Sequence, residues 1–232
     1  RAALAGRLNR LANCRKVMNV LITGGRGTIG RALAREWSGR KGARVVSLGR
    51  SKPGPGDSES DVVSHETGDI SDARFLDEVL ERHDITHIVH AAGARTRDCR
   101  ENPRLAFEAN VLGTESVFQA GLRRAAVRSF AHFSTAAVYG RTAGMVGEGD
   151  LVAPGSAYAL SKAASELVLA SAGARERPFS TVILRPGFVL APGASGSLAG
   201  LISDAMTREL VRGSLAERLP LHWALDLGKA LV

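Results

Sequence analysis

The segment Val20-Leu-Ile-Thr23-Gly24-Gly25-Arg26-Gly27-Thr28-Ile29-Gly30 decides the fold of this chain. Its first four residues form a short apolar, β-branched run that is typical of a buried strand. After the glycines, Ile29, Leu33 and Trp37 recur at helical spacing. A glycine-rich turn between a strand and a helix lets the backbone approach a pyrophosphate, which then lies at the helix N-terminus. An ordinary glycine-rich turn is the alternative, but this placement between strand and helix favours a dinucleotide site.

Further apolar runs alternate with helical patterns along the rest of the chain. Strands are expected at residues 43–48, from Val62 to Gly68, and at 85–90, 127–134 and 180–185, with helices between them. This alternation predicts an α/β fold, a Rossmann-type doubly wound parallel sheet covered on both faces. Ligands bind at the carboxyl ends of such strands. We therefore expect one edge of the sheet to be lined by Gly24, Asp69, Ala91 and Thr135.

The end of the second strand indicates which dinucleotide is bound. Dinucleotide folds usually place an acidic residue about 20 residues beyond the glycines, where it holds the ribose 2′-hydroxyl. Gly49-Arg50 stands there instead, and Arg26 adds a second cation within the glycine loop. Guanidinium groups without a nearby acid suit a 2′-phosphate, so we predict NADP, with NAD as the alternative. If both arginines are only solvated loop charges, this preference disappears.

Tyr158 and Lys162 are the candidate catalytic pair. Residues four apart on a helix share a face, and an ammonium beside a phenol favours the phenolate, so we expect the pKa of Tyr158 to be lowered. The hydroxyl of Thr135, at a strand end, could hold the substrate oxygen against that phenol. The pattern Tyr-x-x-x-Lys also occurs by chance on many helices, and it is the glycine loop that makes proton transfer at a C–OH/C=O centre the better interpretation.

Composition excludes several other classes of protein. The chain has 232 residues and a net charge of +8, but residues 1–17 contribute five positive charges and no acidic residue, which leaves only +3 for the rest. That is too little to indicate nucleic-acid binding. No apolar run approaches the roughly 18 residues of a membrane span. The two cysteines, Cys14 and Cys99, and the six histidines show no metal spacing, so we expect no metal, structural roles for His87 and His90, and a reducing cytoplasm.

A set of short motifs gives this chain a resemblance to a known family. In chain order they are Thr23-Gly-Gly-Arg-Gly-Thr-Ile-Gly30, Gly68-Asp-Ile70, His90-Ala-Ala-Gly93, Asn110-Val-Leu-Gly-Thr114, Phe133-Ser-Thr-Ala-Ala-Val-Tyr-Gly140, Tyr158-x-x-x-Lys162 and Arg185-Pro-Gly187. With these motifs the chain resembles the extended short-chain dehydrogenase/reductase family, the NAD(P)-dependent epimerase/dehydratase group. The motifs span residues 18 to 193, and together they are far more specific than any one of them.

The resemblance implies a role for most of the motif residues. It implies that Asp69 contacts the adenine, Tyr158 is the acid/base, Lys162 holds the nicotinamide ribose, and Thr135 takes the position of the family's active-site Ser/Thr. The expected catalytic residues are Thr135, Tyr158 and Lys162. The expected cofactor-binding residues are Gly24, Arg26, Gly27, Thr28, Ile29, Gly30, Arg50, Asp69, Ile70, Ala91, Ala92, Gly93, Asn110, Tyr158, Lys162 and Pro186. The expected substrate-binding residues are Arg95, Thr135 and Tyr158.

The chain departs from the family pattern beside Thr135. The family's sugar dehydratases carry an Asp-Glu pair after this threonine, and related dehydratases and decarboxylases carry a Glu two residues after it. Here these positions are Ala136 and Ala137. Because water elimination needs an acid and a base besides the tyrosine, the sequence favours an epimerase or a ketone/alcohol oxidoreductase over a dehydratase.

Both ends of the chain lie outside the well-matched region. Residues 1–17 are expected to be an extension outside the fold, a targeting presequence being the alternative, and residues 18–232 form the NAD(P)-binding Rossmann domain. Residues 187–232 are expected to contribute to a small, truncated C-terminal substrate lobe, in which Asp226 could cap a helix. Members of the family normally continue further than this.

Three functions remain open at this point. The first is an NAD(P)-dependent oxidoreductase or epimerase acting on a nucleotide sugar or a related small molecule. The second is a non-catalytic NADP-binding protein with a redox-sensing or assembly role, and the third is a reductase of hydrophobic ketones. Arg95, Arg97 and Arg100 suit an anionic substrate, although surface solvation explains them equally well. For partners we expect a small-molecule substrate and a homodimer, with no nucleic acid and no membrane.

Overall fold

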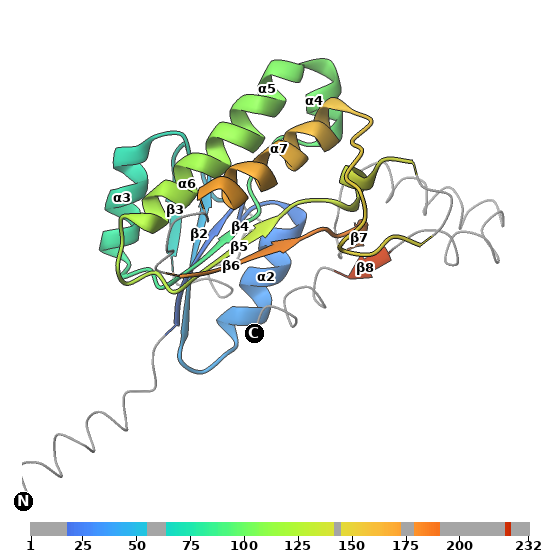
Figure 1. The fold of residues 1–232 in the computed structure, drawn as a ribbon. Coiled ribbons are helices and arrows are strands. Elements are labelled where there is room, and N and C mark those ends of the chain that lie inside the picture. The colour runs from blue at the N-terminus through green and yellow to red at the C-terminus, as the bar shows by residue number, and fades with distance from the viewer. Residues whose placement is uncertain (1–17, 55–63, 142–144, 173–178, 191–220, 224–232) are drawn as a thin grey trace, which may run out of the picture.

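A single parallel sheet forms the centre of the molecule (Figure 1). The computed structural model describes residues 18–54, 64–141, 145–172, 179–190 and 221–223. The sheet has six strands in the order β3-β2-β1-β4-β5-β6, and all neighbouring pairs are parallel. The strands are β1 (Met18–Thr23), β2 (Ala43–Gly49), β3 (Ser64–Thr67), β4 (His87–His90), β5 (Ser129–Phe133) and β6 (Ser180–Leu184). This order confirms the predicted doubly wound fold, and its direction reverses between β1 and β4.

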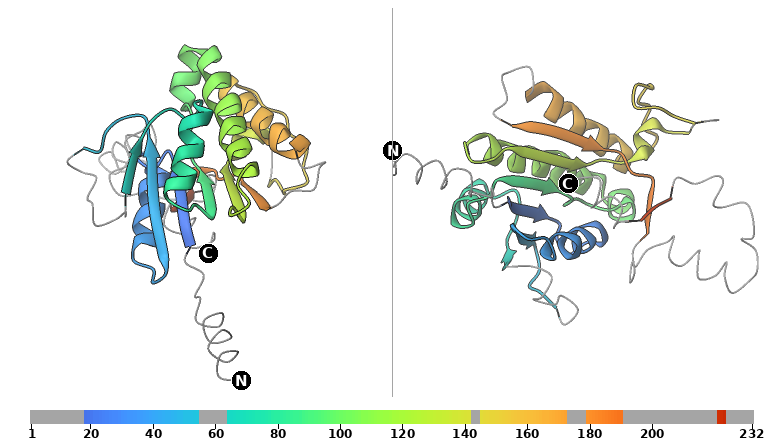
Figure 2. Two further views of the ribbon diagram at one scale, coloured as in Figure 1. Left: turned by 90° about the vertical axis from the view of Figure 1, so that its left-hand side faces the viewer. Right: turned by 90° about the horizontal axis from the view of Figure 1, so that it is seen from below.

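Helices cover both faces of the sheet (Figures 1 and 2). On one face lies α2 (Thr28–Ser38), and on the other lie α3 (Ala73–Arg82), α6 (Gly113–Leu122) and α7 (Ala157–Ser171). The helical segment expected before the strand at 127–134 is broken into α5 (Pro103–Phe107), a π-helical turn η2 (Glu108–Leu112) and α6. The Asn102 side chain caps α5, with Pro103 in its first position, and this separates α5 from α4 (Thr96–Glu101).

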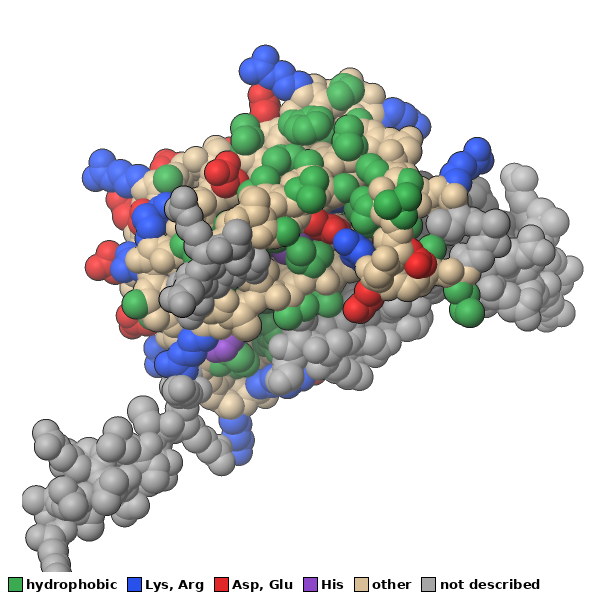
Figure 3. All heavy atoms as spheres, in the orientation of Figure 1, with side chains coloured by type: hydrophobic (Ala, Val, Ile, Leu, Met, Phe, Trp, Pro, Cys, Tyr) green, Lys and Arg blue, Asp and Glu red, His purple; other side chains and the backbone are tan. Residues whose placement is uncertain are grey.

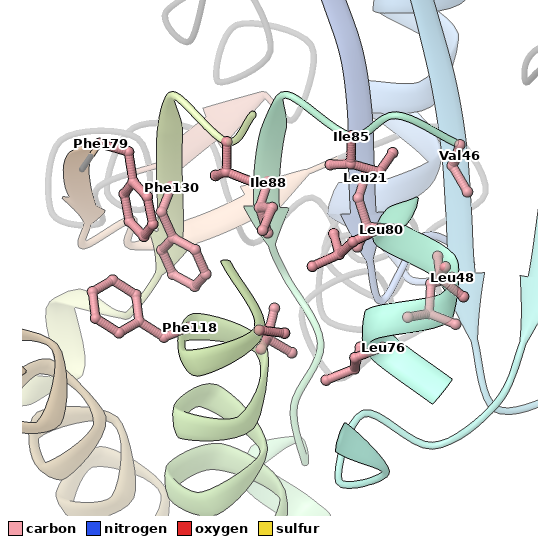
Figure 4. Packing of buried hydrophobic residues seen from close by; sticks show 14 of the residues in the cluster. Leu21, Val46, Leu48, Leu76, Leu80, Ile85, Ile88, Phe118, Phe130 and Phe179 are labelled. Carbon is pink, nitrogen blue, oxygen red and sulfur yellow. The ribbon is translucent and has the colours of Figure 1, made fainter. Parts of the chain in front are cut away.

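The alternation of side chains along the strands builds two cores. Leu21, Ile88 and Phe130 point to the face covered by α3 and α6, where Phe118 and Phe179 complete the packing (Figure 4). On the other face, a second cluster packs against α2 and consists of Val20, Ile22, Leu33, Ala34, Trp37, Val45, Val89, Ala131 and Phe133. Burying one such side chain contributes about 1.5–3 kcal/mol. The two cores therefore fix the register of the sheet and, with it, the alignment of the strand ends.

The remaining elements are short. The 3₁₀ turn η3 (Ala136–Tyr139) follows β5, and β7 (Phe188–Leu190) pairs in parallel with β8 (Leu221–Trp223) in a separate two-stranded sheet. The expected extension at 1–17, the strand start at Val62, most of the expected lobe at 187–232 and the cap at Asp226 lie outside the described residues. Within the described part, no helix is long and apolar enough to cross a membrane, and no group of His, Cys, Asp or Glu has the arrangement of a metal site.

Candidate active site

The glycine loop lies against the end of β4. Gly24 has a positive φ of 68°, and a Cβ there would come within 2.6 Å of the Ala92 nitrogen. A side chain at Gly30 would collide with the carbonyl oxygen of Gly24, so α2 can begin directly above the loop only with glycine at this position. Gly27 is the N-cap of α2, and Thr28 and Ile29 begin the helix. The structure thus brings the predicted loop residues together with Ala91 and Ala92 where the sheet order reverses.

Asp69 and Arg50 lie beyond the carboxyl ends of β3 and β2. The Asp69 carboxylate accepts hydrogen bonds from the backbone N–H and the hydroxyl of Ser71, both at 2.8 Å. The backbone hydrogen bond is the main reason why the pKa of Asp69 is lowered, and the charge of Arg50 acts in the same direction. Both side chains are exposed, and the partly buried Ile70 packs against Gly113 of α6.

Arg26 is directed inward, unlike Arg50. Its guanidinium lies against Gly49, and Nη2 donates to Thr67 Oγ1 at 3.2 Å and to the Glu66 carbonyl at 3.4 Å. The Nε and Nη1 atoms are buried and have no hydrogen-bond partner among the described residues. A buried N–H group without an acceptor is costly. The contacts of Arg26 therefore differ from those of a freely solvated loop charge, because the guanidinium lies over the end of β2.

A directed chain of hydrogen bonds connects β1, β4 and η2. Thr114 Oγ1 donates to the Asn110 carbonyl at 2.6 Å, so it must accept from His90 Nε2–H at 3.0 Å. His90 Nδ1 is then the acceptor for the Thr23 hydroxyl at 2.7 Å, and Thr23 accepts from the Ala92 N–H at 3.4 Å. Burial lowers the pKa of His90 to about 3, so the ring stays neutral. The predicted structural role of this histidine agrees with these contacts.

The side chain of Asn110 is occupied by interactions inside the protein. Its Oδ1 accepts from the Ala94 N–H at 2.7 Å, and its Nδ2 donates to Ser161 Oγ at 2.9 Å. Gly93 lies directly beside this amide. The side chain is fully buried. Asn110 therefore holds the loop after β4 against α7. The sequence predicted that Asn110 binds the cofactor, but its amide is used for these internal contacts.

Tyr158 lies in the first turn of α7 and faces Thr135. Ser156 caps the helix by accepting from the Ala159 N–H at 3.1 Å, which sets where α7 begins. Burial raises the pKa of Tyr158, and a hydrogen bond with the Thr135 side chain acts in the opposite direction. The sequence predicted a phenol made more acidic by Lys162. The structure shows the opposite shift, because removing the ring from water penalises the phenolate.

Lys162 is one turn further along α7 and is buried, with 4% of the residue exposed. Burial lowers the pKa of its ammonium to about 8, while the charge of Glu166 acts to raise it. The Cys99 thiol lies in the same region, and burial raises its pKa. The structure therefore brings Thr135, Tyr158 and Lys162 together, with a lysine whose pKa burial lowers to about 8.

Two serines anchor the backbone under this pair. Ser161 donates to the Tyr158 carbonyl at 2.8 Å, and Ser165 donates to the Lys162 carbonyl at 2.7 Å. Because the Ser165 proton is used in this way, Ser165 accepts from His132 Nε2–H at 2.9 Å. Sequence reasoning missed these residues. A polar stripe at positions 158, 161, 162, 165 and 166 of an otherwise apolar helix was the available signal.

Glu166 and Arg185 were also missed as site residues. Glu166 accepts from the Ser134 hydroxyl and forms a two-pronged ion pair with Arg185, whose closest contact is Nη2–Oε2 at 2.6 Å. Arg185 also donates to the Tyr139 hydroxyl at 2.7 Å. The adjacent Pro186, predicted to bind cofactor, is buried, and its carbonyl accepts from the Ala136 N–H at 2.8 Å.

Arg95 and Arg97 form surface ion pairs. Arg95 Nε lies 3.0 Å from Asp98, Arg97 Nε lies 2.9 Å from Glu101, and both arginine side chains are 78% exposed. Arg95 also begins α4 as its N-cap. For these two arginines, the structure favours the interpretation as solvated surface charges.

Together the sheet order, the glycine loop at its switch point and the Tyr158–Lys162 pair define a Rossmann-fold dinucleotide-binding protein. The chain belongs to the NAD dependent epimerase/dehydratase family, whose sequence model matches residues 20–232. This confirms the resemblance to the extended short-chain dehydrogenases/reductases and identifies an NAD-dependent family.

The chain is similar to several characterised proteins. A dTDP-glucose 4,6-dehydratase of Streptomyces antibioticus is 34% identical over 66% of this chain and 48% of its own length. A dTDP-6-deoxy-L-talose 4-dehydrogenase (NAD(P)(+)) of Kitasatospora kifunensis is 31% identical over 85% of this chain and 61% of its own length. Among solved structures, MoeE5 in complex with UDP-glucose and NAD is 26% identical with a TM-score of 0.72, covering 92% of this chain and 70% of that one. The chain thus spans about half to three fifths of the length of these two curated relatives.

Proposed function

We propose that this chain is the cofactor-binding and proton-transfer part of a nucleotide-sugar epimerase or oxidoreductase. The observation that carries the proposal is the hydrogen bond between the Tyr158 and Thr135 side chains, on a helix whose next turn presents the buried Lys162, at the edge of the sheet where the glycine loop also lies. The relatives named for dTDP- and UDP-sugars support this substrate class.

Thr135, Tyr158 and Lys162 have different roles in the proposed proton transfer. Thr135 and Tyr158 bind the oxygen of the C–OH/C=O centre, and Tyr158 takes or supplies its proton. The Tyr158 phenol is neutral at neutral pH and can therefore donate a proton, as the reduction of a ketone requires. The Lys162 ammonium would bind the ribose hydroxyls of the cofactor. When bound, the dinucleotide supplies or accepts the hydride.

The turn after β5 favours epimerase or oxidoreductase chemistry. Ala136 and Ala137 begin η3 directly after Thr135, so no carboxyl group is available at these positions for water elimination. The nearest acidic residue in the network, Glu166, is held by Arg185 and Ser134. On this ground we favour an epimerase or oxidoreductase over a dehydratase.

NADP is the proposed cofactor, with NAD as the alternative. The Thr23–Gly30 loop would bind the pyrophosphate, and Ala91–Gly93 would lie beneath the dinucleotide. Asp69 and Ile70 would contact the adenine. Arg26 carries the NADP preference, since two of its buried N–H groups have no acceptor among the described residues at the end of β2. A 2′-phosphate at this strand end would place an anionic acceptor beside the guanidinium, which would have to turn for Nε and Nη1 to reach it.

A homodimer is proposed from an exposed apolar surface on one face of the molecule. Phe107 of α5, Leu112 of η2, and Leu160 and Leu167 of α7 are 43%, 53%, 47% and 70% exposed. Figure 3 shows apolar side chains gathered over the α5 and α7 region. Exposed apolar patches of this kind mark protein interfaces.

The direct test is product analysis with UDP- and dTDP-hexoses in the presence of NADP or NAD. It should be run on this chain and on any longer form of the protein that continues past Val232. We expect a C4 epimer, or a keto sugar with matching cofactor reduction, and loss of either product in Tyr158→Phe. Cofactor binding without any turnover in every form would overturn the proposal and favour the non-catalytic binding protein.

A further inference from the structure

Glu166 is a buried carboxylate for which the proposed reaction has no direct use. It lies on α7, one turn beyond Lys162, and is 7% exposed. Its carboxylate contacts the ends of two strands, accepting from the Ser134 hydroxyl after β5 and from the Arg185 guanidinium after β6. Burying a charge in this way is costly unless it is paired, which makes its position informative.

We propose that Glu166 is a positioning residue that keeps the buried Lys162 in its ammonium form and ties α7 to the strand end that carries Thr135. This inference rests on the proposed function, because it assigns Glu166 to the same proton-transfer site. Glu166 is close in sequence or structure to both residues on which it would act. Ser134 immediately precedes Thr135, and Lys162 and Glu166 share one face of α7.

The other titratable groups near Lys162 do not stabilise its ammonium form. His90 of β4 and His132 of β5 interact with its ammonium, but burial lowers the pKa of both rings, so they are neutral near pH 7. The pKa values of Cys99 and Tyr158 are raised, so they are neutral as well. Among the described residues, Glu166 is thus the carboxylate whose charge acts to raise the pKa of Lys162.

Arg185 competes with Lys162 for this carboxylate. Arg185 Nε lies 3.0 and 3.1 Å from the two Glu166 oxygens, and the guanidinium is itself held over the Tyr139 ring, 5.0 Å from its centroid. Through this ion pair the positive charge of Arg185 offsets part of the effect that the Glu166 carboxylate has on Lys162. Removing Glu166 and removing Arg185 should therefore shift the pKa of Lys162 in opposite directions.

The experiment measures the titration of Lys162 in the intact chain, by NMR of lysine labelled with ¹³C at Cε. Lys162→Met assigns the signal. In Glu166→Gln the midpoint should fall by about 1 pH unit or more, the usual effect of losing a neighbouring opposite charge. In Arg185→Gln the midpoint should rise. The matched control is Glu78→Gln, which removes an exposed glutamate ion-paired with Arg74 at 3.2 Å on α3 and should leave the midpoint unchanged.

A parallel titration of NADH affinity against pH separates the two proposals. NADH is used because it lacks the 2′-phosphate, which would titrate in the same range. An unchanged Lys162 midpoint in Glu166→Gln, or shifts of the same sign in Glu166→Gln and Arg185→Gln, would overturn the inference about Glu166. NADH affinity that neither weakens above the Lys162 midpoint nor changes in Lys162→Met would overturn the proposed role of Lys162. If Glu166→Gln fails to fold, the sign of the shift in Arg185→Gln alone decides the matter.

Discussion

Arg26→Met should reduce the affinity for NADPH while leaving the affinity for NADH almost unchanged. The structure separates two arginines that the sequence treats alike. The Arg26 guanidinium is partly buried against Gly49, with Nε and Nη1 lacking acceptors among the described residues, whereas Arg50 is exposed. Because Arg26 is already fixed at the end of β2, we expect it to contribute more to binding the 2′-phosphate of NADP than the exposed Arg50 does.

The size of the expected loss of NADPH affinity follows from the hydrogen bonds that the 2′-phosphate would make. A hydrogen bond to a charged group contributes about 1.5–3 kcal/mol, and about 1.4 kcal/mol corresponds to a tenfold change in Kd. Arg26→Met should accordingly weaken NADPH binding by about 10- to 150-fold. Arg50→Met, the matched control, should have an effect of less than about tenfold, because exposed charges interact weakly through water.

In the cofactor-free protein, Arg26→Met should not lower the stability. Unpaired buried N–H groups cost about 1–3 kcal/mol each, and Arg26→Met removes two of them together with the weaker Nη2 contacts to Thr67 and Glu66. The melting temperature without cofactor should therefore be equal to or higher than that of the wild type.

Fluorescence titration of NADPH and NADH, with thermal unfolding of the same samples, measures both effects. Equal loss of NADPH and NADH affinity, or a lowered melting temperature, would refute the reasoning, because Arg26 would then be a structural residue. A wild-type preference for NADH would refute the NADP proposal itself.

Three further predictions concern the site and its supports. Tyr158→Phe should lower kcat by about 10²- to 10⁴-fold with cofactor Kd nearly unchanged, and turnover at the wild-type rate would exclude Tyr158 as the acid/base. The free energy of unfolding should decrease as the pH falls from about 6.5 towards 3. The reason is that histidines in the unfolded chain gain protons that the buried His90 and His132 do not accept. Each ring should lower the free energy of unfolding by about 1.4 kcal/mol per pH unit. His90→Gln should reduce this slope in urea unfolding measured at several pH values, and an unchanged slope would contradict the assignment. Asn110→Leu should destabilise the protein by about 1–3 kcal/mol, since the buried Ala94 N–H loses its acceptor, and urea unfolding that shows no change would count against this role.

The fold could be predicted because its signals are local. The β-branched run at 20–23, the glycines after it and the helical spacing of Leu33 and Trp37 each depend on neighbours in the sequence. Once strands and helices alternate, the rules for parallel sheets place the strand ends on one edge. That is why the sequence alone was enough to place Gly24, Ala91 and Thr135 at one edge of the sheet, and their grouping into one site stays a prediction.

The supporting residues could not be predicted in this way because their partners are distant in sequence. His132 meets Ser165 and Glu166 meets Arg185 only after β5, β6 and α7 have packed. The π-helical turn around Asn110 depends on i→i−5 hydrogen bonding, for which the residue pattern gives no periodic signal. The raised pKa of Tyr158 likewise depends on burial, which a pair of residues on one helix does not reveal.

The two buried histidines suggest why the site needs neutral rings beneath it. His90 and His132 occupy equivalent positions on adjacent strands and stack with ring centroids 5.4 Å apart. Each donates its Nε2–H to a hydroxyl that in turn donates to a helix carbonyl, Thr114 to Asn110 in η2 and Ser165 to Lys162 in α7. A protonated ring would place a second positive charge close to the buried Lys162, whose pKa is already lowered. Neutral rings can therefore align both helices against the sheet without opposing the ammonium on which the proposed chemistry depends.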